Sequence, residues 1–152
     1  MERRGELRTF PGRVTPADAF LLSLASEIAG SEVICLAADR FRQAEVIQVL
    51  SKIDLAWPIE WRGQGWLDGS EDVRLAQKEI YEARPRTTEN LMLESAIAES
   101  AIIRDPAGNG KLDRAHRRGR IDAIQATVLA LAAGRRVRPS LEDRSEPFVW
   151  AS

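Results

Sequence analysis

The chain has 152 residues, which is enough for one domain with its own hydrophobic core. Its formal net charge of -1 is nearly neutral, so overall charge indicates no nucleic-acid, membrane or acidic partner. Cys35 is the only cysteine, which excludes a disulfide within these residues, and no apolar stretch approaches transmembrane length. We therefore expect a globular protein of a reducing, cytoplasmic compartment.

Hydrophobic periodicity predicts strands that alternate with helices along the chain. In chain order, the predicted elements are a strand over 6–10, a helix between Thr15 and Gly30, a strand over 33–38, a helix over 46–53, a strand over 57–61, helices over 70–80 and 88–97, a strand over 101–103 and a helix over 121–133. This order predicts an α/β domain with a substantially parallel sheet.

Capping residues set the predicted helix boundaries. Thr15, Ser70 and Thr88 are placed as N-caps, and Gly134 as the residue that ends the last helix. The chain is polar and contains proline from Arg138 onward. We therefore predict one domain over residues 1–137 and a C-terminal tail over residues 138–152.

Asp39 directly follows the apolar run 33–38 and precedes a segment with helical spacing. A carboxylate at the carboxyl end of a buried strand lies where open α/β sheets bind their ligands. Aspartate is also a common N-cap. Asp39 is therefore either the cap of the following helix or part of a ligand site.

Asp122 lies in the first turn of the last predicted helix, where the helix dipole favours a carboxylate. The residues before it are rich in basic side chains, namely Lys111, Arg114, His116, Arg117, Arg118 and Arg120. Such a segment is either a solvated loop or a set of contacts to a phosphate backbone. Together with Arg40 and Arg42, which follow Asp39, these residues are our predicted DNA-binding set.

Two carboxylates on different elements, with basic residues beside them, indicate metal-assisted phosphodiester cleavage. Hard divalent cations such as Mg²⁺ prefer oxygen ligands. Such ions can stabilise the attacking and leaving oxygens of an in-line displacement. We therefore predict Asp39 and Asp122 as catalytic residues and metal ligands, although two aspartates alone have low specificity.

Six segments of the chain, in a fixed order, carry a family resemblance. The four less specific ones cover 10–16, 61–65, 71–74 and 108–109. The two most specific are Ala38-Asp39-Arg40-Phe41-Arg42-Gln43-Ala44-Glu45 and Gly119-Arg120-Ile121-Asp122-Ala123. Together, from about residue 5 to about residue 136, they resemble the C-terminal nuclease domain of tailed-phage large terminase subunits.

The resemblance implies a ribonuclease-H-like fold, in which helices flank a mixed central sheet. It implies an endonuclease that cuts concatemeric phage DNA during packaging with Mg²⁺ or Mn²⁺, held in part by Asp39 and Asp122. The implied partners are double-stranded DNA and other terminase or portal components in the cytoplasm of a bacterial host, with no membrane contact.

The chain departs from this family in two ways. It contains no Gly-x-x-x-x-Gly-Lys-Ser/Thr loop, so no ATPase domain is expected within it. It also begins after the strand that carries a further metal-binding aspartate in the family, as in a prophage remnant, a split gene or a cloned fragment. We therefore expect weak or absent activity and an unpaired sheet edge that could support a homodimer. The alternatives are a non-catalytic DNA-binding or packaging-interaction module and a degenerate prophage remnant.

Overall fold

A computed structural model describes residues 9–113 and 121–144 of the chain. The elements in these ranges are α1 (Ala17–Glu27), β1 (Leu36–Asp39), the 3-10 helix η2 (Arg40–Arg42), α2 (Gln43–Lys52), β2 (Ile59–Arg62), α3 (Trp66–Tyr81), α4 (Leu91–Glu99), β3 (Ile102–Arg104), β4 (Gly110–Leu112) and α5 (Asp122–Arg144). The predicted α/β class is confirmed. Within the described ranges, no helix is both long enough and apolar enough to cross a membrane.

The described strands form two separate two-stranded sheets instead of one mixed central sheet. β1 and β2 are parallel, with Leu36 opposite Ile59 and Asp39 opposite Arg62. β3 and β4 are antiparallel and join through a tight turn. Strand β4 was not predicted, because Gly110-Lys111-Leu112 has no apolar alternation that would indicate a strand.

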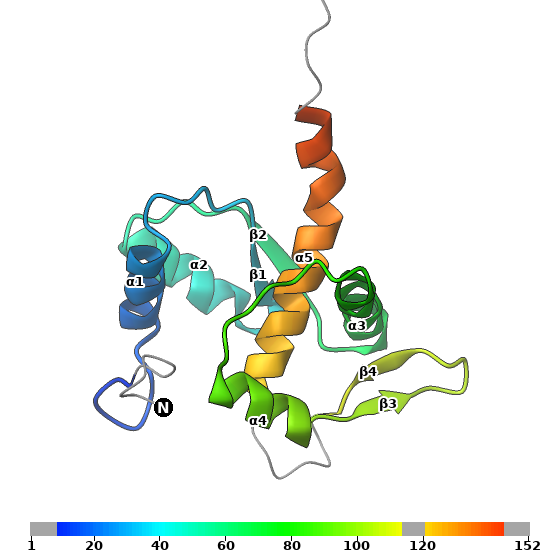
Figure 1. The fold of residues 1–152 in the computed structure, drawn as a ribbon. Helices are drawn as coiled ribbons and strands as arrows, with labels where there is room; N and C mark the ends of the chain where they lie inside the picture. Colours follow the sequence, from blue (N-terminus) through cyan, green and yellow to red (C-terminus); the bar gives the residue numbers. More distant parts are fainter. Residues whose placement is uncertain (1–8, 114–120, 145–152) are drawn as a thin grey trace, which may run out of the picture.

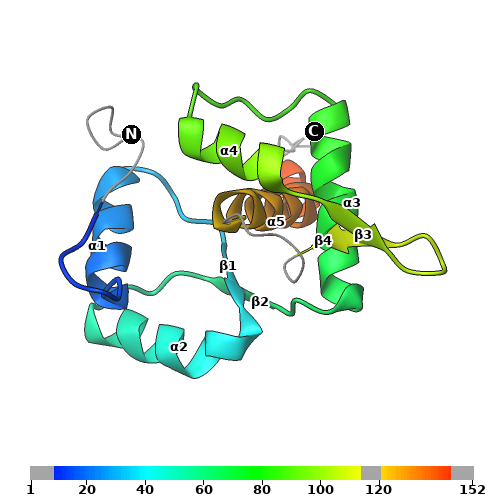
Figure 2. The same cartoon turned by 90° about the horizontal axis from the view of Figure 1, so that it is seen from below.

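Helix α5 lies at the centre of the fold (Figure 1). α1 and α2 lie to one side of it, and α3 and the β3–β4 hairpin lie to the other, as the view along α5 also shows (Figure 2). A buried apolar cluster joins α3, β4 and α5; its members are Val73, Ala76, Leu112, Ile121 and Val128. This packing gives β4 a place in the core, although its sequence alone does not indicate a strand.

Three of the predicted helix starts are wrong by a few residues. Helix α1 has Pro16 as its N-cap instead of Thr15, and α4 is capped by the side chain of Asn90 instead of Thr88. Asn90 Oδ1 accepts a hydrogen bond from Leu93 N at 3.0 Å. Helix α3 begins at Trp66, with Gly65 as its N-cap, so Ser70 lies inside the helix.

The last helix is longer than predicted. α5 continues through Gly134 and Pro139 to Arg144, and so includes the first residues of the predicted tail. The predicted strand over 6–10 lies mostly outside the described residues, and Thr9 and Phe10 are not in a strand.

Candidate functional site

Asp39 ends strand β1, as predicted, and its two oxygens contact different parts of the chain. Oδ1 accepts a hydrogen bond from Phe41 N at 2.9 Å and so caps the 3-10 helix η2. Oδ2 accepts a hydrogen bond from the side-chain amide of Gln64, which follows β2. The capping role considered for Asp39 is therefore confirmed, and the same side chain also joins the ends of the two parallel strands.

An open hollow of about 640 Å³ lies beside Asp39. Asp39, Arg40, Phe41, Arg42, Gly63 and Gln64 line it. The hollow opens widely to solvent, and Phe41, one of the residues that line it, is 93% exposed. The structure thus places one predicted metal ligand and two predicted DNA-binding arginines around a single surface depression at the carboxyl ends of the parallel strands.

The two arginines of the hollow already pair with carboxylates. Arg42 donates to both oxygens of Glu45, at 2.7 and 2.8 Å, while Arg40 lies 3.6 Å from Asp68. The Arg40 and Arg42 side chains remain 63% and 64% exposed, respectively. Exposed pairs of this kind are weak, so both guanidinium groups can exchange their partners for a phosphate at small cost.

Gln64 connects the hollow to the predicted basic segment. A small adjoining cavity is lined by Gln64, Gly69, Val73, Lys111, Leu112 and Gln125. Lys111 Nζ lies 4.7 Å from the centre of the Trp66 ring, within the range of a cation–π contact. Lys111 and Trp66 therefore present a cation and an aromatic surface near Gln64. The remaining predicted DNA-binding residues, Arg114, His116, Arg117, Arg118 and Arg120, lie outside the described residues.

Asp122 is the first residue of α5 and is exposed, next to the buried Ile121. Although β1 packs against α5, Asp122 does not join Asp39 in a larger cluster of ligands. In residues 9–113 and 121–138, no three His, Cys, Asp or Glu side chains lie in a group that could hold a metal ion. Because Mg²⁺ can bind through one or two carboxylates together with waters and phosphate oxygens, the described residues fit only a partial site.

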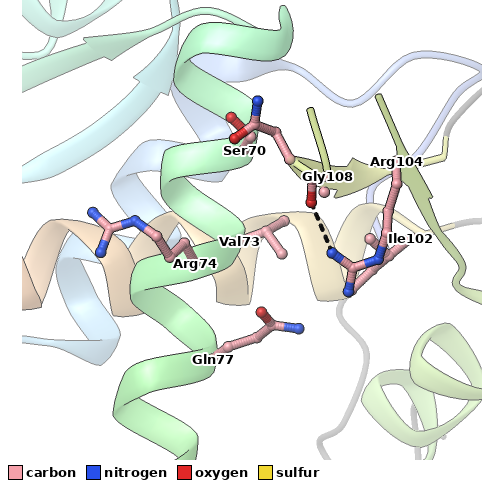
Figure 3. Close-up of a pocket in the computed structure, with 9 residues that line it drawn as sticks. Ser70, Val73, Arg74, Gln77, Ile102, Arg104 and Gly108 are labelled. Atoms are coloured by element: carbon pink, nitrogen blue, oxygen red, sulfur yellow. Dashed lines mark hydrogen bonds between the residues drawn. The ribbon is translucent and has the colours of Figure 1, made fainter. Parts of the chain in front are cut away.

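A separate pocket of about 150 Å³ lies between α3 and the β3–β4 hairpin (Figure 3). Arg104 lines it and donates a hydrogen bond to the Gly108 carbonyl at 2.9 Å. The guanidinium of Arg74, on α3, points away from Arg104 in this view (Figure 3). The two guanidinium groups do not point toward a common position, so this arrangement gives no support for an anion-binding site in the pocket.

Helix α3 carries two buried carboxylates that were not predicted, Asp72 and Glu79, which are only 1% and 3% exposed. Asp72 Oδ1 lies 2.8 Å from Arg136 Nη1 and 3.0 Å from Arg62 Nη2. These ion pairs connect β2, α3 and α5. Because buried charges are stable only when they are paired, the cluster fixes the spacing of the three elements.

Glu79 belongs to a second ion cluster between α3 and α5. Its carboxylate contacts Arg138 at 2.7 Å and Arg135 at 2.7 Å. The hydrogen bond from Arg138 is the main cause that lowers the pKa of Glu79 to about 2. The sequence did contain one sign that these carboxylates are buried. Asp72 and Glu79 are seven residues apart, so they lie on the same face of a helix as the apolar Ala76.

Comparisons with known proteins show similarity to a phage large terminase. No protein-family model matches the chain. The large terminase subunit of Enterobacteria phage HK97 is 28% identical over 131 residues, which cover 86% of this chain and 26% of the terminase. A crystal structure of the HK97 bacteriophage large terminase aligns with a TM-score of 0.79 and 28% identity, over 86% of this chain and 27% of that one. The chain spans about a quarter of that relative's length and is homologous to this part of a phage terminase large subunit.

Proposed function

We propose that this chain corresponds to the nuclease part of a terminase large subunit, with a ribonuclease-H-like arrangement, and acts on phage DNA during packaging. Its reaction is metal-dependent endonucleolytic cleavage of concatemeric DNA. The observation that carries the proposal is the position of Asp39, at the carboxyl end of a parallel strand and beside an open hollow, within the region homologous to a terminase. Ligand sites of open α/β sheets occupy this position.

Distinct roles follow for the described residues, of which Asp39, Arg40 and Arg42 line the hollow. Asp39 and Asp122 would hold Mg²⁺ or Mn²⁺, and the ion would supply positive charge to the phosphodiester oxygens. Arg40, Arg42 and Lys111 bind the DNA backbone, because their cationic groups can neutralise phosphates. Trp66, which is 39% exposed beside Lys111, offers a surface on which a base can stack.

Cleavage by the isolated chain should be weak. Both oxygens of Asp39 accept hydrogen bonds, from Phe41 N and from Gln64, so a cation must compete with these donors. In the described part of the chain, no three His, Cys, Asp or Glu side chains form a group that could hold a metal ion. A low metal affinity follows from this arrangement.

A plasmid-nicking assay at high protein concentration in Mn²⁺ tests the proposal. We expect slow relaxation of supercoiled DNA by the wild-type chain and none by Asp39→Asn, which keeps an acceptor for Phe41 N but removes the charge. Glu94→Gln, on the exposed face of α4, is the matched control and should nick like the wild type. Robust cleavage by Asp39→Asn would contradict the assignment of the site.

A second candidate function is a non-catalytic DNA-binding or packaging-interaction module. The absence of a three-ligand metal group from residues 9–113 and 121–138 favours it, because the Lys111–Trp66 pair requires no metal. Metal-free DNA binding that depends on Lys111, without any Mn²⁺ binding at millimolar concentration, would support this alternative. A chain that binds neither DNA nor Mn²⁺ would instead be a folded prophage remnant.

A further inference from the structure

Asp68 is a largely covered carboxylate in the first turn of α3, and its side chain is 16% exposed. It is the third residue of the helix after the N-cap Gly65. A carboxylate at this position is favoured by the helix dipole and often accepts a hydrogen bond from the N-cap N–H. Asp68 reaches further, because its Oδ2 accepts from Gly63 N, two residues before the N-cap, at 2.6 Å. Helix capping alone does not account for this contact.

The Asp68 side chain also lies close to the ends of both parallel strands. Its Oδ2 is 3.6 Å from Nη2 of Arg40, which directly follows β1. Its Oδ1 is 3.7 Å from Nη1 of Arg62, the last residue of β2, and the Asp68 carbonyl accepts from Arg62 Nη2 at 3.3 Å. Gly63, which donates to Oδ2, is the next residue after β2. One residue of α3 therefore holds the chain where both strands end.

These contacts reach the hollow beside Asp39 through Gln64. Gly63 and Gln64 both line that hollow. On one side of Gln64, the backbone of Gly63 is bonded to Asp68, and on the other side Gly65 begins α3 as its N-cap. The Gln64 side-chain amide then donates to Oδ2 of Asp39. A series of contacts thus runs from Asp68 through Gly63 and Gln64 to the predicted metal ligand.

The contact with Asp68 leaves no room for a side chain at residue 63. A Cβ atom added to Gly63 would lie 2.8 Å from Oδ2 of Asp68, which is too short for a Cβ contact. Alanine at this position therefore pushes the carboxylate away from the backbone N–H. A Cβ atom added to Gly65, in the same loop, would meet no atom within 4 Å, and the φ of −70° at Gly65 suits alanine. The two glycines offer a matched pair of substitutions, of which only one displaces Asp68.

We propose that Asp68 is a positioning residue of the candidate site, which holds the backbone at Gly63 so that the Gln64 side chain stays on Oδ2 of Asp39. Its effect on a metal ion rests on the proposed function, because that ion would bind at Asp39. While Gln64 is held in place, a cation must displace it from Asp39, and release of the loop weakens this competition. All the contacts involved join parts of the described chain, so none of them requires a free surface.

The side-chain amide resonances of Gln64 test this role without metal. In Asp68→Ala the acceptor for Gly63 N is lost, and we expect the Gln64 amide signals of the metal-free chain to move toward those of the exposed Gln48. Asp68→Asn loses the same charge but keeps an acceptor, so the Gln64 signals should stay near their wild-type positions. Unchanged Gln64 signals in Asp68→Ala, or equal shifts in both variants, would overturn the proposal.

Gly63→Ala gives a second perturbation, which keeps the charge of Asp68. It should shift the Gln64 side-chain signals as Asp68→Ala does, whereas Gly65→Ala should leave them near their wild-type positions. When Asp68→Ala is already present, the added Cβ no longer meets a carboxylate, and Gly63→Ala should cause no further shift. Equal effects of the two glycine substitutions would overturn the proposal.

Calorimetric titration of Mn²⁺ measures what this positioning does at the site. Asp68→Ala and Asp68→Asn lose the same charge, so a difference between them reports on the loop. We expect Asp68→Ala to bind Mn²⁺ more tightly than Asp68→Asn, by up to about fivefold, and both to bind equally once they also carry Gln64→Ala. Equal affinities while Gln64 is present would overturn the proposal. An absence of Mn²⁺ binding in every variant would contradict the proposed metal site alone, because the Gln64 signals decide the role of Asp68 without metal.

Discussion

The side-chain amide of Gln64 donates a hydrogen bond to Oδ2 of Asp39 and so joins the end of β1 to the loop after β2. The other oxygen, Oδ1, accepts from Phe41 N at 2.9 Å. The carboxylate at the centre of the candidate site therefore also has a structural role. Any cation that binds Asp39 competes directly with Gln64.

Removal of this competitor should strengthen metal binding. In Gln64→Ala, Oδ2 of Asp39 loses its donor, and a hydrogen bond of this type contributes about 1 kcal/mol. We expect Mn²⁺ affinity, measured by calorimetry, to rise about fivefold. Gln48→Ala, on the exposed face of α2, should leave the affinity unchanged. A lower affinity in Gln64→Ala would mean that Gln64 is itself a ligand.

The capping role of Asp39 predicts a difference in stability between two variants. Asp39→Ala removes the acceptor for Phe41 N and should lower the free energy of unfolding by about 1 kcal/mol. Asp39→Asn keeps an acceptor and should lose less. Urea unfolding measures both values, and equal losses would show that the cap does not stabilise η2.

Local patterns predicted much of the fold, including β1 and the position of Asp39 at its end. The apolar run 33–38 and the helical spacing after it gave a sufficient signal. The contact of Gln64 with Asp39 could not be predicted, because it joins residues 25 positions apart through the pairing of two strands. Aspartate before a helix predicted the cap, but nothing local indicated its second partner.

The length of α5 shows how tertiary contacts outweigh local signals. Glycine costs about 1 kcal/mol inside a helix, and Gly134 was therefore predicted to end it. In the structure, Arg135, Arg136 and Arg138 lie beyond Gly134 and pair with carboxylates of α3, β2 or the residue after α3. These ion pairs and the apolar contacts with α3 stabilise the helix past the glycine, and the sequence alone does not show that α3 lies beside it.

The buried ion cluster around Asp72 should be essential for folding. Asp72→Asn keeps the volume of the side chain but leaves Arg62 and Arg136 without their buried partner charge. Breaking a buried pair in this way typically costs about 3–5 kcal/mol, and we expect a loss of that order in urea unfolding. Asp18→Asn, which weakens an exposed pair with Lys52, is the control and should cost much less. Similar losses in both variants would contradict the structural role of Asp72.

Glu79 predicts how stability depends on pH. Its pKa is lowered from 4.5 to about 2, mainly by the hydrogen bond from Arg138, so the folded state favours the ionised form. This contribution is present above pH 4.5 and is lost as the pH falls toward 2. We expect the unfolding free energy of the wild type to fall across this window more steeply than that of Glu79→Gln. Parallel pH profiles would contradict the role of Glu79.

Lys111 should contribute one phosphate contact to DNA binding. Its Nζ lies over Trp66, at 4.7 Å from the ring centre, and is positioned near Gln64. We expect Lys111→Ala to weaken double-stranded DNA binding for all sequences and to reduce the salt-dependence slope by about one unit. Lys52→Ala, on α2, is the matched control and should not change the slope. An unchanged slope in Lys111→Ala would remove Lys111 from the DNA-binding set.

The central claim is that Asp39 holds a divalent cation at the carboxyl end of β1. Calorimetric titration of Mn²⁺ into the wild-type chain, Asp39→Asn and Glu94→Gln tests it most directly. We predict one weak site in the wild type and Glu94→Gln, and a loss of affinity of about tenfold or more in Asp39→Asn. No binding at millimolar Mn²⁺, or equal affinity in all three proteins, would contradict the claim.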